Sequence, residues 1–318
     1  MGIVAHSKAW LGQVGDTDIR LLKVFKAVVD CGGMAAAELE LNIGRSTISR
    51  HVKDLEERLG LVLCRRGRGG FALTDEGQRV HADTLNLLGA LESFRTHVGQ
   101  MHGQLTGTLR LGLFDKTVTN PAARIDRALR AFRAQAPQVR LELTIGALNV
   151  LEPGVIDGQL HLAVVPDHRR SQSLQYTPLF DEQMHLYCGR EHPLFARDPV
   201  ALDDVRPADC AGLAFHSPNM EVTRRFGLKR SAMVNDQEAV ALLVRSGGYV
   251  GFLPDHYAAP FVAQGEMRRV ALAELGYTVD FVAVARASST SDRLAQTFLR
   301  CLEAAHGVQV PWDNPPDS

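Results

Sequence analysis

The chain has 318 residues, 45% of them hydrophobic, and a formal net charge of −1 at pH 7, so we expect two or three packed domains. No run approaches the roughly 20 apolar residues that span a bilayer, and residues 1–17 lack the basic and apolar blocks of a signal peptide, which predicts a cytoplasmic protein without a membrane partner. The five cysteines are an odd, scattered set without a C-x-x-C pair, which argues against a disulfide framework and a thiolate metal site.

Two short helices are predicted near the start, after an N-terminal extension over residues 1–17. An apolar stripe with helical spacing ends at a break over residues 31–33, and a helix from Met34 to Leu41 leads into a turn at residues 42–44. The stripe consists of Leu21, Leu22, Phe25, Val28 and Val29. Short helices joined by such turns are typical of a helix-turn-helix.

A third helix is predicted over residues 44–59, with one apolar and one polar face. Ile48, Val52, Leu55 and Leu59 recur at steps of four, three and four, which places them on one buried stripe. The opposite face offers hydroxyls and cations to bases and phosphates. These candidate DNA-binding residues are Arg45, Ser46, Thr47, Ser49, Arg50 and Lys53. Taken alone, the face also fits an ordinary amphipathic surface helix.

A wing is predicted over residues 61–73, where two short apolar strands flank a basic, glycine-rich tip. Arg65, Arg66 and Arg68 lie in this tip and are further candidates for DNA contacts. Residues 45–68 include seven basic and three acidic side chains, which gives this segment a net charge of +4 in a chain whose net charge is −1. A local basic excess is typical of a surface that contacts phosphates, so double-stranded DNA is the predicted partner.

These residues resemble the LysR-type transcriptional regulators. The resemblance continues more loosely to about residue 305 and departs from the usual pattern at Glu38 and at residues 44–46. The matching residues are Asp18-Ile19-Arg20-Leu21-Leu22, Phe25, Ala37, Leu41, Ser49-Arg50, Leu55-Glu56-Glu57-Arg58-Leu59-Gly60, Leu63 and Leu73-Thr74-Asp75-Glu76-Gly77. The resemblance implies a winged helix-turn-helix DNA-binding domain (18–74), a long dimerising helix, a two-lobed effector domain similar to periplasmic binding proteins, and assembly as a dimer of dimers.

A long helix is predicted over residues 75–106, with Thr74 as its N-cap. Apolar residues spaced alternately by four and three form a seam along it, which favours pairing with a second copy as a homodimer through residues 75–105. The alternative is that the stripe packs on the C-terminal domain of its own chain. The seam residues are Val80, Thr84, Leu87, Leu91, Phe94, Val98, Met101 and Leu105.

The remaining chain, residues 107–306, alternates between strands and helices and predicts an α/β effector domain. Strands near 109–113, 139–145 and 160–165 are separated by helices, which implies a parallel sheet. We expect the chain to pass from one lobe to the other at residues 166–167 and to return near Met267. This gives lobe I (107–166 and 267–306) and lobe II (167–266). Residues 307–318, rich in proline and charge, are predicted to be a disordered tail.

Effectors of such a domain are expected in the cleft between the lobes, at the carboxyl ends of the strands. Lys116 and the N-terminus of a helix that is expected to start near Asn120 and Pro121 predict a positive potential in this cleft. The predicted effector is therefore a small organic anion such as a carboxylate. Any single member of the set also fits a solvated loop. The candidates are Phe114, Asp115, Lys116, Thr117, Asn149, Asp167, His168, His216 and Ser217.

No enzyme motif competes with this interpretation, because G-x-S-x-G, H-E-x-x-H, the P-loop and G-x-G-x-x-G are all missing from the sequence. The histidines lack helical metal-ligand spacing, no basic residue flanks Cys210, and we expect neither a catalytic residue, a metal nor a cofactor. The sequence predicts a ligand-responsive regulator that binds a pseudo-palindromic operator. The alternative is a solute-binding protein or small-molecule enzyme with an N-terminal oligomerisation module.

Overall fold

The structure, a computed structural model, describes residues 14–67, 70–101, 105–215, 217–287 and 292–307. It consists of two compact units, residues 1–95 with 157–159 and residues 96–156 with 160–318. Most of the expected N-terminal extension and of the expected tail lies outside the described residues. Among the described helices, none is both long and apolar enough to cross a membrane.

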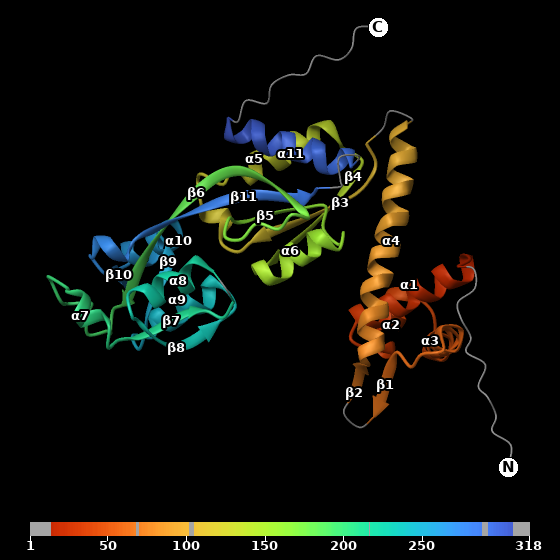
Figure 1. Ribbon diagram of the computed structural model, residues 1–318, viewed down its shortest axis with the longest axis horizontal. Coiled ribbons are helices and arrows are strands. Elements are labelled where there is room, and N and C mark those ends of the chain that lie inside the picture. Colours follow the sequence, from red (N-terminus) through yellow and green to blue (C-terminus); the bar gives the residue numbers. More distant parts are fainter. Residues whose placement is uncertain (1–13, 68–69, 102–104, 216, 288–291, 308–318) are drawn as a thin grey trace, which may run out of the picture. The chain divides into compact units, whose positions relative to one another are not determined.

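The N-terminal unit is a winged helix-turn-helix, as the periodicities predict. Helices α1 (Asp16–Asp30), α2 (Met34–Leu41) and α3 (Arg45–Leu59) precede strands β1 (Cys64–Gly67) and β2 (Gly70–Leu73), and α4 (Asp75–Met101) follows (Figure 1). The strands pair antiparallel, with Gly67 opposite Gly70. The apolar stripes form one core, in which Phe25, Ile48, Val52, Leu55 and Leu63 are fully buried. Burying these side chains stabilises the unit by about 1.5–3 kcal/mol each.

Side chains at the end of α3 fix the start of the wing. Glu56 accepts hydrogen bonds from the backbone N–H groups of Leu63 (2.7 Å) and Cys64 (3.1 Å). Gly60 ends the helix with φ 66°, a left-handed conformation that favours glycine. The helix is therefore tied directly to the first strand of the wing.

The start of α4 depends on Thr74 and Gly77. The Thr74 hydroxyl donates to the Val62 carbonyl (2.6 Å) and accepts from the Gly77 N–H (2.9 Å), as an N-cap does. A Cβ atom at position 77 would lie 2.1 Å from the Leu63 carbonyl oxygen, so only glycine fits there. This contact explains why a glycine follows the threonine and two acidic residues at this turn.

The first half of the C-terminal unit has the predicted parallel β-α-β-α-β order. Strand β3 (Gly107–Phe114) pairs in parallel with β4 (Val139–Gly146) and with β5 (Leu162–Pro166). Helices α5 (Ile125–Gln135) and α6 (Leu148–Ile156) lie on opposite faces of this sheet, and α11 (Arg293–His306) packs beside α5 (Figure 1).

The second half adds a further α/β lobe. In chain order, its elements are β6 (Leu174–Gly189), α7 (Leu202–Val205), β7 (Asp209–Leu213), α8 (Pro218–Arg225), β8 (Lys229–Val234), α9 (Gln237–Arg245), β9 (Val250–Pro254), α10 (Asp255–Ala263) and β10 (Met267–Arg269), and then β11 (Tyr277–Arg286) returns to the first lobe. Short 3₁₀ turns, η1 (Thr117–Thr119) and η2 (Ala273–Leu275), complete the set. The described strands form one mixed sheet in the order β4-β3-β5-β11-β6-β9-β7-β8, with β10 beside β6.

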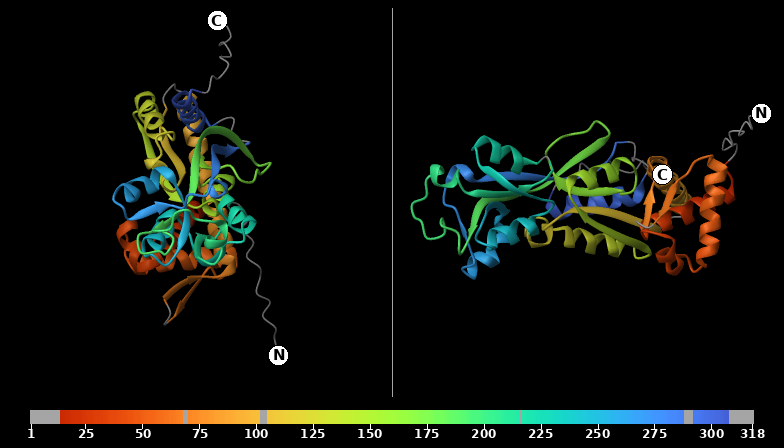
Figure 2. Two further views of the ribbon diagram at one scale, coloured as in Figure 1. Left: turned by 90° about the vertical axis from the view of Figure 1, so that its left-hand side faces the viewer. Right: turned by 90° about the horizontal axis from the view of Figure 1, so that it is seen from below.

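Strand β11 pairs antiparallel along its whole length with residues 174–184 of β6, and both strands run through both lobes, as the views in Figure 2 also show. In this region the sequence pattern predicts a strand only over residues 184–188, because residues 174–183 do not alternate cleanly and contain Pro178, which is unfavourable in a strand. It also placed the return near Met267, whereas β10 pairs with Tyr187–Gly189 of β6 and Met267 packs in the core of the second lobe. The chain in fact returns to the first lobe along β11.

Candidate DNA-binding and effector sites

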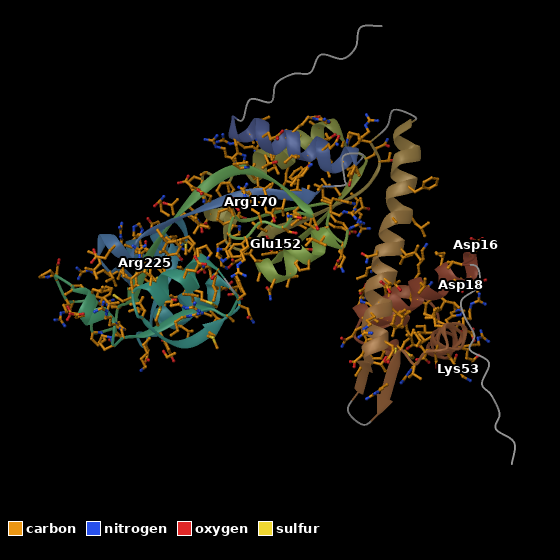
Figure 3. The ribbon with its side chains drawn as sticks, viewed as in Figure 1. Asp16, Asp18, Lys53, Glu152, Arg170 and Arg225 are labelled. Atoms are coloured by element: carbon orange, nitrogen blue, oxygen red, sulfur yellow. The ribbon has the colours of Figure 1, made fainter. Side chains whose placement is uncertain are left out.

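The polar face of α3 is presented as the sequence predicts. Arg45, Ser46, Arg50 and Lys53 are exposed, while Thr47 and Ser49 are partly buried. The Glu38 carboxylate on α2 accepts a hydrogen bond from the Arg45 N–H at the start of α3, which is a structural role for this departure from the usual family residue. Lys53, labelled in Figure 3, lies 3.4 Å from Glu57 in an exposed i,i+4 pair.

One charge of the predicted basic cluster is paired within the N-terminal unit. Arg58 makes a bidentate contact with Asp18 on α1, with Nε 2.6 Å from Oδ1 and Nη2 3.1 Å from Oδ2. Asp18 is 1% exposed, so this pair ties α3 to α1. In the wing Arg65 is exposed, whereas the side chain of Arg66 and all of Arg68 lie outside the described part of the chain.

The predicted seam of α4 is partly exposed in the single chain. Leu91 is 39% and Phe94 66% exposed, while Val80 packs against the core of the N-terminal unit. Leu105 packs against the core of the C-terminal unit, so it does not extend the seam. The side chains of Val98 and Met101 lie outside the described set.

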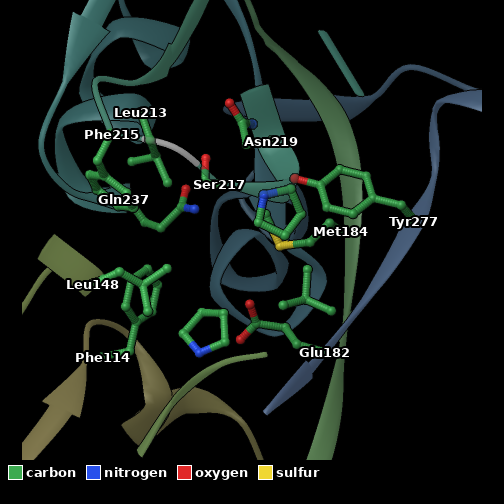
Figure 4. Close-up of a pocket in the computed structure, with 13 residues that line it drawn as sticks. Phe114, Leu148, Glu182, Met184, Leu213, Phe215, Ser217, Asn219, Gln237 and Tyr277 are labelled. Atoms are coloured by element: carbon green, nitrogen blue, oxygen red, sulfur yellow. The ribbon is translucent and has the colours of Figure 1, made fainter. Parts of the chain in front are cut away.

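A small cavity of about 20 Å³ lies between the two lobes of the C-terminal unit (Figure 4). The first lobe contributes the ends of β3 and β5 and the start of α6, and the second contributes the end of β7 and the starts of α8 and α9. The crossing strands β6 and β11 close the remaining side. Its lining residues are Phe114, Leu148, Pro166, Glu182, Met184, Leu213, Phe215, Ser217, Pro218, Asn219, Gln237, Tyr277 and Val279.

One side of this cavity carries buried polar atoms that have no hydrogen-bond partner within the described chain. They are Oγ of Ser217 and Oε1 of Gln237, on residues that are at most 4% exposed, whereas the Asn219 side chain hydrogen-bonds with Tyr277. Leaving a buried polar atom unpaired costs about 1–3 kcal/mol. Side chains arranged in this way are suited to a ligand that supplies the missing hydrogen bonds.

A cation lies behind Asn219. A Cβ atom at Gly212 would lie 3.0 Å both from Nε of Arg230 and from Oδ1 of Asn219, so the guanidinium and the amide are neighbours. Arg230 also donates from Nη2 to the Leu213 carbonyl. This side of the cavity therefore combines hydrogen-bond donors with a positive charge.

The opposite wall carries a carboxylate. Glu182 on β6 is 5% exposed, and its Oε2 lies 2.8 Å from Nε2 of His256. Nδ1 of the same histidine lies 2.8 Å from the Thr119 hydroxyl of the first lobe. Glu182 cannot be found from the sequence pattern, because it lies in the part of β6 that does not alternate as a strand.

Lys116, the expected anion partner, does not line this cavity. Its Nζ lies 2.9 Å from Oε2 of Glu238 on α9 and 5.0 Å from the centre of the Tyr257 ring, so it connects the two lobes. Asp115 also bridges the lobes, because its Oδ2 accepts a hydrogen bond from the Gln237 N–H (2.8 Å). Burial raises the pKa of Asp115, and this hydrogen bond opposes the rise.

The other expected effector residues are divided between several places. Phe114 and Ser217 line the cavity, while Asp115, Lys116 and Asn149 line a neighbouring hollow of about 500 Å³. Thr117 is buried and donates to the Phe114 carbonyl (3.3 Å), Asp167 pairs with Arg170 (2.7 Å), and Nε2 of His168 lies 3.8 Å from Glu221 on α8. His216 lies outside the described residues.

Two expectations that supported a positive cleft are wrong. No described helix starts at Asn120 or Pro121, because α5 begins at Ile125 and Asn120 instead accepts from the Ala122 N–H in a turn. The expected positive potential is also offset, because three further acidic residues gather beside Asp115 and Lys116. They are Glu182, Asp236 and Glu238.

Comparison with known proteins decides the family. Residues 19–78 match the bacterial regulatory helix-turn-helix protein model of the lysR family, and residues 102–307 match the LysR substrate binding domain model. The chain belongs to the LysR family of bacterial transcriptional regulators. The family assignment favours the regulator over the solute-binding or enzymatic alternative.

Similar LysR proteins cover nearly the whole chain. The HTH-type transcriptional activator BauR of Pseudomonas aeruginosa is 43% identical over 294 residues, 92% of this chain and 96% of its own. The crystal structure of CbnR, a LysR family transcriptional regulator, has a TM-score of 0.65 at 21% identity and covers 91% of this chain and 99% of its own. Full-length CbnR complexed with its target DNA has a TM-score of 0.64 at 22% identity, covering 90% and 99%.

Burial disfavours the thiolate form of two cysteines of this LysR protein. Burial raises the pKa of Cys210 to about 12 and that of Cys188 to about 11. The reactive species of cysteine is the thiolate, which is scarce at neutral pH when the pKa is so high. Nothing basic flanks Cys210 in the sequence, and Arg230, its partner on β8, opposes the rise in pKa only in part.

Proposed function

We propose that this LysR-family regulator responds to a small organic molecule that carries a carboxylate and binds in the cavity between the lobes. The observation that carries the proposal is the pair of buried, unpartnered polar atoms on Ser217 and Gln237, beside the buried amide of Asn219. A ligand that completes these hydrogen bonds favours the form in which the lobes hold it, and so shifts the population of that form.

A carboxylate fits the chemistry of the second-lobe wall. The Ser217 hydroxyl and the Asn219 amide supply donors, and Ser217 stands at the N-terminus of α8, where the helix dipole favours an anion. The nearby Arg230 adds a positive charge. Hydrogen bonds to a charged acceptor are roughly twice as strong as neutral ones, which favours an anion over a neutral carbonyl.

For DNA, we propose that Ser49 and Arg50 contact bases in the major groove from α3, and that Arg65 and Arg68 hold phosphates from the wing. Arg45, Ser46, Thr47 and Lys53 would add contacts at the first turns of α3, and Arg66 at the wing. This assignment is supported by the exposed cations on α3 and by Arg65 on β1. Base contacts set sequence preference, whereas phosphate contacts set affinity and its salt dependence.

We further propose a homodimer through α4 and a dimer of dimers through the effector domains. Exposed Leu91 and Phe94 support the first interface. Exposed apolar side chains near both edges of the sheet support the second: Leu143 and Ile145 on β4, and Met233 and Leu242 on β8 and α9. Two recognition helices on a two-fold axis require a pseudo-palindromic operator with half-sites about one helical turn apart.

The effector site is tested by thermal shift with a panel of small carboxylates, on wild-type protein and on Asn219→Ala. At about a hundred times its dissociation constant a ligand adds roughly 2.7 kcal/mol to stability, a readily measured shift in Tm. We expect Asn219→Ala to lose this shift and the matched variant Asn149→Ala, on an exposed residue outside the cavity, to keep it. An equal shift in Tm in both variants would mean that the carboxylate binds outside this cavity.

A further inference from the structure

A histidine of the second lobe joins the crossing strand β6 to the first lobe. His256 lies in the first turn of α10, and its side chain is 12% exposed. Its Nε2 lies 2.8 Å from Oε2 of Glu182 on β6, and its Nδ1 lies 2.8 Å from the hydroxyl oxygen of Thr119 in η1. Both ring nitrogens therefore have a polar partner, and one of these partners belongs to the other lobe.

The hydrogen atoms in this network can be counted. A carboxylate only accepts hydrogen bonds, so the Nε2 that faces Glu182 carries a hydrogen. The Thr119 hydroxyl has a single hydrogen, and two acceptors compete for it, Nδ1 of His256 at 2.8 Å and the Lys116 carbonyl at 3.0 Å. When the hydroxyl donates to the carbonyl, Nδ1 must also carry a hydrogen, and the ring is an imidazolium. All three contacts are hydrogen bonds at once only if the network holds this additional proton.

We propose that His256 is a proton-dependent latch, which holds the two lobes together as an imidazolium and weakens when the ring becomes neutral. Histidine is the side chain whose charge ordinarily changes between about pH 5 and 8. An imidazolium makes charge-assisted hydrogen bonds, which are roughly twice as strong as neutral ones. A neutral ring leaves the buried Glu182 carboxylate without a counter-charge at this contact. The latch requires no effector, so it goes beyond the function proposed above.

The latch also bears on the contact that Lys116 makes across the cleft. Lys116 has φ 62°, a left-handed conformation that is unfavourable for a residue with a side chain. Its carbonyl accepts hydrogen bonds from both the N–H and the hydroxyl of Thr119, and this turn presents its ammonium group to Glu238 on α9. A neutral His256 draws the hydroxyl away from that carbonyl, which loosens the turn as well as the direct contact between the lobes.

The charges near the latch favour the additional proton. Within the described part of the chain, three further carboxylates and one ammonium group interact electrostatically with Glu182, directly or through one another. Four carboxylates less one ammonium group leave a charge of −3, which attracts a proton. The groups are Glu182 on β6, Asp115 and Lys116 after β3, and Asp236 and Glu238 at the start of α9.

Among the described residues, the remaining titratable groups around the latch are either neutral or confined to the second lobe, apart from Asp115. Burial raises the pKa of Tyr257 on α10 and of Tyr277 on β11, which keeps both uncharged. His185 pairs with Asp255 at 2.7 Å within the second lobe. Asp115 does connect the lobes, and burial raises its pKa, so its protonation needs a control of its own. The other neighbours on this side of α10 are Tyr187 on β6 and Arg269 on β10.

The distance between the lobes in the full-length protein without ligand tests this inference. Spin labels on unnatural amino acids at the exposed positions Gln138, in the first lobe, and Gln264, in the second, leave the native cysteines unlabelled. Labelled chains are diluted into unlabelled protein, and pulsed electron paramagnetic resonance gives the distance distribution at about pH 6 and about pH 8. We expect the ratio of closed to open lobes in the wild type to fall about fivefold as the pH rises over this range. A distribution that does not change with pH would overturn the inference.

Three variants place the pH dependence on the latch. His256→Gln cannot take up the proton, so at both pH values its lobes should show the ratio that the wild type shows at the higher pH. Thr119→Val keeps the size of the side chain and removes the hydroxyl, so it should lose the pH dependence although the histidine and Glu182 remain. His185→Gln is the matched control, because it removes a histidine that is paired with a carboxylate within one lobe, and it should behave as the wild type does.

Asp115→Asn separates the latch from the second titratable group. This variant keeps an oxygen for the Gln237 N–H, and we expect it to retain a pH dependence. If the pH dependence persists in His256→Gln, or disappears in His185→Gln, the latch is not the source and the inference fails. If His256→Gln does not fold, Thr119→Val decides, since a pH dependence that persists without the hydroxyl also overturns the inference. None of these outcomes bears on the carboxylate site beside Ser217, which the panel of carboxylates tests separately.

Discussion

Replacing Lys116 with methionine should weaken the effector response by about fivefold without abolishing it. The ammonium group lies 2.9 Å from Glu238, whose side chain is 66% exposed, and 5.0 Å from the centre of the Tyr257 ring. An ion pair with an exposed partner contributes about 0.2–1 kcal/mol, and a cation over a partly exposed ring such as that of Tyr257 about 0.5–1 kcal/mol. Their loss costs the closed form roughly 1 kcal/mol, which corresponds to the fivefold change.

The assay is a calorimetric titration with the carboxylate that gives the largest thermal shift in wild-type protein. A double-mutant cycle with Glu238→Gln isolates the pair, and the cycle should return a coupling of about 0.2–1 kcal/mol. Lys229→Met is the matched control, because Lys229 makes an exposed pair with Asp209 (2.8 Å) within the second lobe and not across the cleft. This control should leave the affinity unchanged.

Complete loss of binding in Lys116→Met, in a variant with unchanged Tm, would refute this reasoning. Such a result would mean that Lys116 contacts the ligand directly, as its position after β3 suggested from the sequence. The site would then lie in the neighbouring hollow that Asp115, Lys116 and Asn149 line, and not in the cavity beside Ser217.

Three further predictions concern DNA binding, assembly and stability. Leu91→Asp and Phe94→Asp each place an unpaired charge in the proposed apolar seam at a cost of several kcal/mol, so sedimentation should show dissociation of the dimer, and an unchanged oligomer in both variants would rule the seam out. Arg65→Ala should weaken binding to all duplex sequences alike and reduce the slope of log K against log salt by about one, whereas a change confined to one sequence would contradict a phosphate contact. The Arg58 guanidinium lowers the pKa of Asp18 below its usual 3.8, so the stability that Asp18 contributes is present above about pH 4 and is lost as the pH falls through the lowered value. The difference in unfolding free energy between wild type and Asp18→Asn should therefore shrink over that pH range. A difference that stays constant with pH would argue against the pair.

Much of the fold could be predicted from the sequence, because its local patterns are strong. The period of the stripe Ile48, Val52 and Leu55 identified α3 and the side it buries, and all three residues are at most 1% exposed. Phe114 and Ser217 line the cavity because they lie at or after the carboxyl ends of strands that meet there, and their contact with an effector stays a prediction. Each of these inferences used information from one short segment of the chain.

The rest of the site could not be predicted, because it depends on contacts between distant segments. Lys116 meets Glu238, 122 positions later, and no local pattern indicates that pairing. Asn219 and Gln237 occupy the first turns of α8 and α9, and α8 was not predicted as a helix at all. Glu182 lies in an irregular part of β6, where its carboxylate resembled that of an exposed loop residue.

The contacts across the cleft bear on how a ligand can control this molecule. Lys116 with Glu238, and Asp115 with the Gln237 N–H, stabilise the closed lobes whether or not a ligand is present, so weakening them raises the effector concentration needed for half of the response. Ser217 and Asn219, in contrast, are proposed to give the ligand its preference for one form. A ligand shifts an equilibrium only by its difference in affinity for the two forms, and a change from 1:99 to 99:1 needs about 5.5 kcal/mol. Variants of the first group should therefore shift the midpoint of an effector titration at full amplitude, and variants of the second should reduce the amplitude itself.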